Sequence, residues 1–264
     1  MAERLPLIRQ APGSWIDWWG ALGGSAAAVA AVLPRATRRV VEPTAELAEL
    51  SRRALRRRWW SFGAPPQDQV CLAANVAPGQ AQMVWANMML HASPNPPATV
   101  AGWHAALGVG GFLMFSTLGP DSLRELRQVY ADQGWPAPHP PFTDMHDIGD
   151  LLVGSGFADP VMDQELIRLS WSSPQAMLGE LRSLGGHLGP GRQPGLRTPR
   201  WRERLHQALQ QRADAQGRIH LSFELVYGHA FKAPPRPGRG EPATVSLESL
   251  RHSLRNRRSG PGGE

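Results

Sequence analysis

The sequence predicts an α/β fold built on a mainly parallel β-sheet. Short segments rich in β-branched and aromatic residues alternate with longer amphipathic patterns, which is the order expected of strands joined by helices. The stretch GGFLMFST, residues 110–117, has the apolar centre of a strand that is covered on both faces. The glycine-containing turn GALGGS directly follows the first β-rich segment. Together these features indicate a sheet with helices on both of its faces.

The first half of the chain supplies most of this sheet. An alanine-rich helix ending near Pro34 follows the first strand, and Thr44 is placed to cap a second helix in which Leu47, Leu50 and Leu55 form an apolar stripe. A third helix is expected at about residues 97–107. The expected strands are at residues 14–19, 38–42, 69–73, 82–86 and 110–117.

Beyond Gly119 the pattern changes to helices and longer strands. Asp121 is expected to cap the amphipathic stretch SLRELRQVYAD. Alternating apolar residues predict strands at residues 161–171 and 219–232. Two helices are expected between these strands, at residues 174–184 and 199–214.

The charge distribution indicates one domain followed by a basic tail. The net charge is +6, and +4 of it belongs to residues 232–264, a segment rich in proline and glycine. We therefore predict a domain at residues 1–232 and a flexible tail at 233–264. Residues 121–165 hold nine acidic residues against two arginines, so a basic body that binds nucleic acid is not expected. The run RRALRRR, residues 52–58, is interpreted as the solvated end of a helix rather than as a nucleic-acid stripe, and it is also able to meet an acidic protein.

The cysteine count and the hydropathy indicate a cytoplasmic protein. Cys71 is the single cysteine, which excludes an intramolecular disulfide and a cysteine-based zinc site. No run approaches the roughly 20 apolar residues needed to cross a bilayer, and the first residues lack the pattern of a signal peptide.

The turn after the first strand is a candidate nucleotide site. Gly20, Gly23 and Gly24 allow close approach of a ligand to the backbone. Glu42 ends the second strand, where a carboxylate can accept both hydroxyls of a ribose. By themselves these residues fit an ordinary tight turn and a solvated glutamate better than a nucleotide site.

The segment FTDMHDIGD, residues 142–150, admits two interpretations. Ile148, Leu151 and Leu152 recur at helical spacing, and Asp144 or Asp147 can cap the helix. His146 and Asp150 have the HxxxD spacing of a cation site, but no matching motif occurs elsewhere in the chain. We therefore predict a capped helix and no metal.

Several phrases together resemble one enzyme family. VWANMMLH (84–91), GGFLMFSTLGPDSLRELR (110–127), FTDMHDIGDLLVGSGFADPVMDQE (142–165) and ELVYGHAF (224–231) are similar to the malonyl-[acyl-carrier protein] O-methyltransferases of biotin synthesis. These belong to the class I S-adenosylmethionine-dependent methyltransferases. The resemblance implies a Rossmann-like sheet of seven strands, mostly parallel, with the last strand antiparallel.

The resemblance also implies cofactor-binding residues for S-adenosyl-L-methionine. By position, Asp17, Gly20 and Gly23 match the cofactor turn. Glu42 matches the ribose-binding acid, and Asn87 matches the residue that closes the pocket after the fourth strand. Asn75 stands where the family has an acid near the adenine amino group. The family's usual turn has one residue between its aspartate and first glycine, whereas this sequence has Trp18 and Trp19.

The implied reaction is methylation of the free carboxyl group of a malonyl thioester, with acyl carrier protein or coenzyme A as the carrier. The malonyl carboxylate needs a cation, for which Arg192 is the candidate, although a loop arginine is also compatible with a plain surface role. His229 is a second candidate, as a pocket-lining residue. The alternatives are a methyltransferase with another small acceptor and a degenerate methyltransferase fold kept as a binding or regulatory module. A Rossmann dehydrogenase also uses glycines and an acid, but the later phrases do not fit it.

Overall fold

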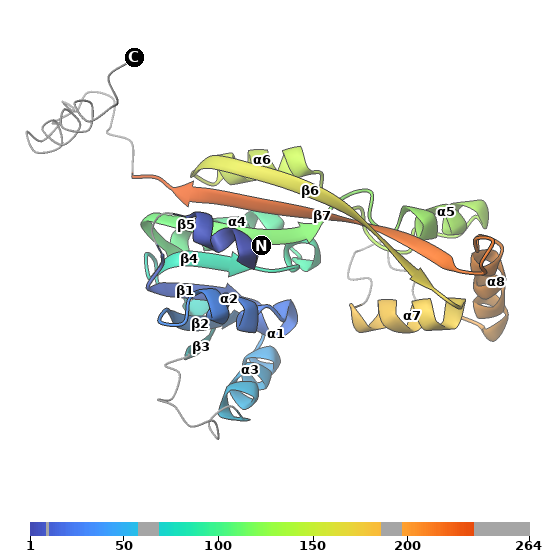
Figure 1. Ribbon diagram of the computed structural model, residues 1–264, viewed down its shortest axis with the longest axis horizontal. Coiled ribbons are helices and arrows are strands. Elements are labelled where there is room, and N and C mark those ends of the chain that lie inside the picture. Colours follow the sequence, from blue (N-terminus) through green and yellow to red (C-terminus); the bar gives the residue numbers. More distant parts are fainter. Residues whose placement is uncertain (9–10, 58–68, 186–196, 235–264) are drawn as a thin grey trace, which may run out of the picture. The chain divides into compact units, whose positions relative to one another are not determined.

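Seven strands form one mixed sheet in the order β3-β2-β1-β4-β5-β7-β6 (Figure 1). The computed structural model describes residues 1–8, 11–57, 69–185 and 197–234. Strands β1 to β5 are parallel, whereas β7 is antiparallel to both β5 and β6. The predicted sheet, mostly parallel with an antiparallel last strand, is confirmed. The strands are β1 (Ser14–Trp18), β2 (Thr37–Glu42), β3 (Gln69–Leu72), β4 (Ala81–Ala86), β5 (Leu107–Leu118), β6 (Phe157–Trp171) and β7 (Ile219–Lys232).

Helices pack on both faces of the sheet. One face is covered by α2 and the 3-10 helix η1, which share a core with Trp15, Met83 and Trp85. The opposite face is covered by α4 and α6, whose buried residues pack with Leu113 and Phe115 of β5. The helices are η1 (Ala2–Leu7), α1 (Gly20–Gly23), α2 (Ala26–Val32), α3 (Ala45–Arg57), η3 (Ala73–Asn75), η4 (Leu90–Ala92), α4 (Pro96–Ala106), α5 (Arg124–Asp132), α6 (Met145–Gly154), α7 (Pro174–Ser183) and α8 (Pro199–Gln210).

Side-chain caps determine where several helices begin. Thr44 Oγ1 accepts a hydrogen bond from the Leu47 N–H at 3.3 Å, so the predicted cap of α3 is confirmed. Asn95, Ser173 and Thr198 accept equivalent bonds at α4, α7 and α8. These bonds satisfy backbone donors that the first helical turn leaves without partners.

The prediction that Asp121 caps α5 is wrong. The helix begins at Arg124 after Leu123, which has a left-handed backbone (φ 57°), and no side chain caps it. The Asp121 N–H instead donates to the Glu224 carboxylate at 2.7 Å. A Cβ added to Gly119 would lie 2.5 Å from Glu224 Cδ, so a side chain here would displace the Glu224 carboxylate. The loop after β5 is therefore shaped by a carboxylate of β7, a tertiary contact that the local pattern does not contain.

Strands β6 and β7 extend past the rest of the sheet and carry a second core. The last β5–β7 pair is Leu118 with Leu225, whereas β6 and β7 stay paired as far as Trp171 and Ile219. Helices α5, α7 and α8 gather around this overhang (Figure 1). These three helices and the overhanging ends of β6 and β7 are hereafter the distal lobe. Its buried residues are Leu126, Val129, Trp171, Met177, Leu205, Leu209, Ile219, Leu221 and Phe223.

By its contacts the chain divides into two units, Met1–Ala233 and Pro234–Glu264. Nearly all of the second unit lies outside the described residues, and so does the sequence run from Arg58 to Asp68. None of the helices in the described ranges is long and apolar enough to span a bilayer.

Candidate functional site

The turn at the carboxyl end of β1 combines a tryptophan with a backbone conformation typical of glycine. Trp19 has φ 58° and ψ 46° and directly precedes α1. Bulky residues rarely adopt this left-handed conformation, because their Cβ crowds the neighbouring backbone. Trp19, which directly precedes Gly20, is thus the residue that takes the left-handed conformation in this turn.

Asp17 is held inside the edge of the sheet by an arginine of the neighbouring strand. Its Oδ2 lies 2.5 Å from Arg38 Nη2, and the two side chains are only 2% and 13% exposed. The Arg38 guanidinium also lies over the Trp15 ring. A Cβ on Gly20 would lie 2.7 Å from Asp17 Oδ2. Glycine at position 20 is thus required by the buried carboxylate beneath it.

Glu42 at the end of β2 is fully buried and has one carboxylate oxygen to spare. Its Oε1 accepts hydrogen bonds from the Ala21 N–H at 2.8 Å and from Ser51 Oγ at 2.7 Å. Its Oε2 is buried without a hydrogen-bond partner among the described residues. Burial raises the pKa of this carboxyl group above its ordinary value. A buried acceptor without a donor is unfavourable, and a pair of ribose hydroxyls at this position would satisfy it.

Asn87 joins the cofactor turn to the middle of the sheet. Its Nδ2 donates to the Gly23 carbonyl at 2.6 Å, and its Oδ1 accepts from Ser116 Oγ at 2.8 Å. A Cβ on Gly23 would lie 3.3 Å from the Asn87 carbonyl oxygen, so the two segments are in close contact. Asn75 ends η3 after β3 and is exposed.

Six of the eight predicted site residues therefore lie at one edge. Parallel strands present their carboxyl ends together, and this is where α/β sheets bind their ligands. The residues are Asp17, Gly20, Gly23, Glu42, Asn75 and Asn87, which follow or end β1, β2, β3 and β4. The structure thus supplies a cradle in which Glu42 offers a free acceptor and Asn87 fixes the turn.

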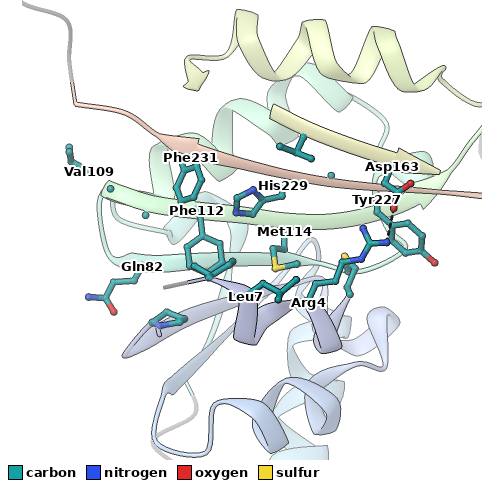
Figure 2. A pocket seen from close by; sticks show the side chains of 17 residues that line it. Arg4, Leu7, Gln82, Val109, Phe112, Met114, Asp163, Tyr227, His229 and Phe231 are labelled. Atoms are coloured by element: carbon teal, nitrogen blue, oxygen red, sulfur yellow. Dashed lines mark hydrogen bonds and ion pairs between the residues drawn. The ribbon is translucent and has the colours of Figure 1, made fainter. Parts of the chain in front are cut away.

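His229 lies elsewhere. It lines a cavity of about 620 Å³ on the face of the sheet that η1 covers, together with Phe112, Met114 and Tyr227 (Figure 2). Burial lowers the pKa of its imidazole, which favours the neutral form. Its register partner is Met114, four positions before the end of β5, so the structure does not bring it to the carboxyl edge. Arg192, the other predicted substrate residue, lies outside the described residues.

Sequence reasoning missed a histidine at the carboxyl edge. His91 lies in η4, directly after β4, and its backbone N–H donates to Thr117 Oγ1 at 3.1 Å. Its ring Nδ1 lies 3.3 Å from the same oxygen, and its ring meets Phe142 edge to face. Burial lowers the pKa of His91 to about 4, so the imidazole is neutral at pH 7. A single histidine in VWANMMLH has no spacing that distinguishes it from a core residue.

The FTDMHDIGD segment forms the predicted capped helix. Asp144 Oδ1 accepts from the His146 N–H at 2.8 Å at the start of α6, and Ile148 and Leu152 are buried. Within the described ranges no group of three metal-ligating side chains is placed to hold an ion. The acidic residues of this segment are accounted for by the start of the helix.

Curated relatives share most of the chain. A malonyl-[acyl-carrier protein] O-methyltransferase of Gallionella capsiferriformans is 36% identical over 252 residues, which is 93% of this chain and 86% of the relative. A protein of the same name from Laribacter hongkongensis is 37% identical over 245 residues, 90% of this chain and 82% of the relative. No protein-family profile matches the chain.

Solved structures with a similar fold are methyltransferases. A candidate methyltransferase of Bacillus halodurans superposes with a TM-score of 0.58 at 13% identity, covering 88% of this chain and 99% of that chain. A Haemonchus contortus N-methyltransferase in complex with S-adenosylhomocysteine gives a TM-score of 0.52 at 12% identity, with 88% and 51% covered. The fold is the Rossmann-like fold of S-adenosylmethionine-dependent methyltransferases, and with the identity to its curated relatives, this chain belongs to the malonyl-[acyl-carrier protein] O-methyltransferase family.

Proposed function

We propose that this protein transfers a methyl group from S-adenosyl-L-methionine to the free carboxyl group of malonyl-loaded acyl carrier protein, in the synthesis of a biotin precursor. Relatives that share about nine tenths of the chain bear the name of this activity. The structural observation that carries the proposal is Glu42, a buried carboxylate with one unsatisfied oxygen at the carboxyl edge of the sheet.

The residues at this edge fit the cofactor. Glu42 Oε2 would accept the ribose hydroxyls, and Gly23 would keep the backbone open beside Asn87. Asn75 would border the adenine with an amide in place of an acid. Asp17 would support the turn from below, because its carboxylate is engaged by Arg38. When bound, S-adenosylmethionine supplies an electrophilic methyl group on a sulfonium sulfur.

The acceptor chemistry asks little of the protein's own side chains. A malonyl carboxylate is already ionised at neutral pH and forms the new oxygen–carbon bond without losing a proton, so no general base is required. Holding the acceptor in line provides most of the rate enhancement that such a site can supply. A neutral His91 beside Thr117 offers a hydrogen-bonding group at this edge without adding a fixed charge.

A cation must still pair with the malonyl group if its carboxylate is taken from water. Arg192 remains our candidate for this role. His229 remains a candidate for contact with a more distant part of the substrate, since it lies in the cavity shown in Figure 2. We expect the protein to act in the cytoplasm, without a nucleic acid or membrane partner.

The proposal is tested by titration with S-adenosylhomocysteine followed by an assay of methyl transfer. Malonyl-loaded carrier protein and malonyl-coenzyme A are each incubated with S-adenosylmethionine, and the mass of the thioester product is measured. We expect saturable cofactor binding and a product heavier by one methylene group. Binding without methylation of either thioester would contradict the proposed acceptor, and absence of cofactor binding would contradict the enzymatic function itself.

A further inference from the structure

The distal lobe stands beyond the edge at which the cofactor residues gather. Strand β7 is antiparallel to β5, so its residues before Leu225 continue past Leu118, the carboxyl end of β5. Residues 219–224 pair only with β6 and extend about 20 Å at roughly 3.3 Å per residue. A macromolecule seated on this lobe would lie within reach of the carboxyl edge.

One side of the lobe presents three arginines around two tryptophans. The guanidinium of Arg197 lies 4.4 Å from the centre of the Trp201 ring, and that of Arg204 lies 5.5 Å from the centre of the Trp135 ring. The two indoles pack against each other with centroids 5.0 Å apart. Arg200 is exposed and lies one helical turn before Arg204 on α8. Stacking on rigid rings pre-organises the guanidinium forks, so less side-chain entropy is lost when they bind a partner. These three residues, Arg197, Arg200 and Arg204, are hereafter the arginine surface.

The positive charge of this surface is not balanced within the domain. In the part of the chain that the structure describes, no carboxylate lies within ion-pair distance of any of the three. Nearby acids have other partners, since Asp132 pairs with Arg212 and Glu203 accepts from Gln207. The neighbouring undescribed residues, 186–196, contain no acid.

The positions of Arg200 and Arg204 are also unfavourable for the stability of α8, the helix on which they lie. The first turn of α8 has no acidic residue, although the positive end of the helix dipole favours one there. Arg200 and Arg204 form a like-charge pair at i,i+4 spacing, which destabilises a helix. An anionic partner would relieve both effects. Within the fold, Arg204 donates to the neutral Gln133 Oε1 at 3.0 Å, a contact that leaves its charge unbalanced.

We propose that the arginine surface docks an acidic face of the carrier protein that delivers the malonyl thioester. The inference rests on the proposed function for the identity of the partner. Its location rests on two exposed arginines, Arg200 and Arg204, and the half-buried Arg197, none of which has a carboxylate partner among the described residues. A protein partner fits better than a small anion, because Arg200 and Arg204 lie along the outside of α8 and Arg197 lies just before its first turn. None of the three lines the cavity around His229 or the smaller one between β1 and β2. The arginines at the end of α3 are less suited, because Arg52 and Arg53 are already engaged by Glu49.

The test compares two acceptors that share the malonyl thioester and differ in the carrier. Malonyl-loaded carrier protein offers an acidic surface, and malonyl-pantetheine offers neither a protein nor a phosphate. For the variant Arg200→Glu/Arg204→Glu we expect the ratio of kcat/KM for the carrier-bound to the pantetheine-bound acceptor to fall at least tenfold. We expect the Kd for malonyl-loaded carrier protein, measured by titration, to rise by a similar factor and to depend less on salt than in the wild type.

Two further variants serve as controls. Arg35→Glu reverses an exposed arginine before β2, at the opposite edge of the sheet, and is expected to leave the ratio unchanged. Arg200→Gln/Arg204→Gln removes the charge without reversing it, and should have a smaller effect of the same sign. The docking proposal is wrong if Arg200→Glu/Arg204→Glu binds malonyl-loaded carrier protein with the Kd of the wild type. It is also wrong if this variant loses kcat/KM equally on the carrier-bound and the pantetheine-bound acceptor. If the wild type methylates neither acceptor, the proposed function fails, and the titration still decides whether these arginines bind the carrier protein.

Discussion

The carboxyl edge and the distal lobe each contain an arginine–aspartate pair with the same closest distance and different surroundings. Arg38 and Asp17 meet at 2.5 Å with side chains that are 13% and 2% exposed. Arg212 and Asp132 also meet at 2.5 Å, with side chains that are 39% and 47% exposed. Burial removes water as an alternative partner for the first pair, whereas both groups of the second stay hydrated.

Because one ion pair is buried and the other is exposed, the two regions are suited to different kinds of ligand. At the carboxyl edge, buried polar groups of the described residues bond to one another, and Glu42 Oε2 is left as an acceptor without a partner among them, which suits a small ligand in a fixed position. In the distal lobe the arginines lie on the surface and remain hydrated, which suits a protein partner bound largely through long-range charge.

The largest expected effect comes from breaking the buried pair. Arg38→Met keeps much of the side-chain volume but leaves the Asp17 carboxylate without its guanidinium partner. We expect a loss of about 3–5 kcal/mol in the free energy of unfolding, measured by urea denaturation. Asp17→Asn/Arg38→Met should recover a large part of this loss, because it removes the buried charge as well. A single variant as stable as the wild type would show that water reaches this pair.

A smaller effect is expected from pH, through His91. Its pKa is about 4 in the folded protein against an ordinary value of 6.5, so between these values the unfolded chain binds more protons. The contribution of neutral His91 is fully present above pH 6.5 and is lost as the pH falls towards 4. From about pH 7 to about pH 5 we expect about 2 kcal/mol of stability to be lost through this residue. His91→Gln should lose correspondingly less over the same range. Parallel pH dependences of the two proteins would contradict this assignment.

The cofactor cradle is tested by Glu42→Gln. Glutamine can still accept the bonds from the Ala21 N–H and Ser51, but its amide nitrogen cannot accept the ribose hydroxyls in place of Oε2. We expect the Kd for S-adenosylhomocysteine, measured by calorimetric titration, to rise at least tenfold, or about 1.4 kcal/mol. Replacing Asn75 with alanine provides a comparison at the same edge, where we expect a smaller rise. An unchanged affinity in Glu42→Gln would remove Glu42 from the cofactor site.

The smallest effect is expected from the exposed pair. Asp132→Asn removes the charge that meets Arg212 but leaves a polar side chain in water. We expect no measurable change in Tm, because solvent screens the pair and replaces its hydrogen bond. A destabilisation comparable to that of Arg38→Met would mean that exposure is a poor guide to the energetics of such pairs in this protein.

The sequence predicted elements whose causes are local. Alternating apolar residues at 219–232 predict a strand, and β7 spans Ile219–Lys232. Caps such as Thr44 and Asp144 depend on residues two or three positions away, so their patterns identified α3 and α6. Asp121 does not cap α5, because the helix begins only at Arg124, after a left-handed Leu123. The preceding loop is held by Glu224, about a hundred residues later, which accepts from the Asp121 N–H.

The features of the candidate site are likewise of two kinds, those that the sequence predicts and those that only the tertiary structure determines. The sequence by itself determined the family, the succession of strands and helices, and the positions of Glu42 and Asn87 at or after strand ends, because strand ends and family phrases are local features of the sequence. Only the tertiary structure decided that Arg38 holds Asp17, that Trp19 takes a conformation typical of glycine, and that His229 lies away from this edge. It also placed the arginines of α8 beyond the carboxyl ends of the strands. A local apolar pattern indicates that a segment is buried, as at residues 110–117, but not which distant segment packs against it, and these outcomes depend on that partner.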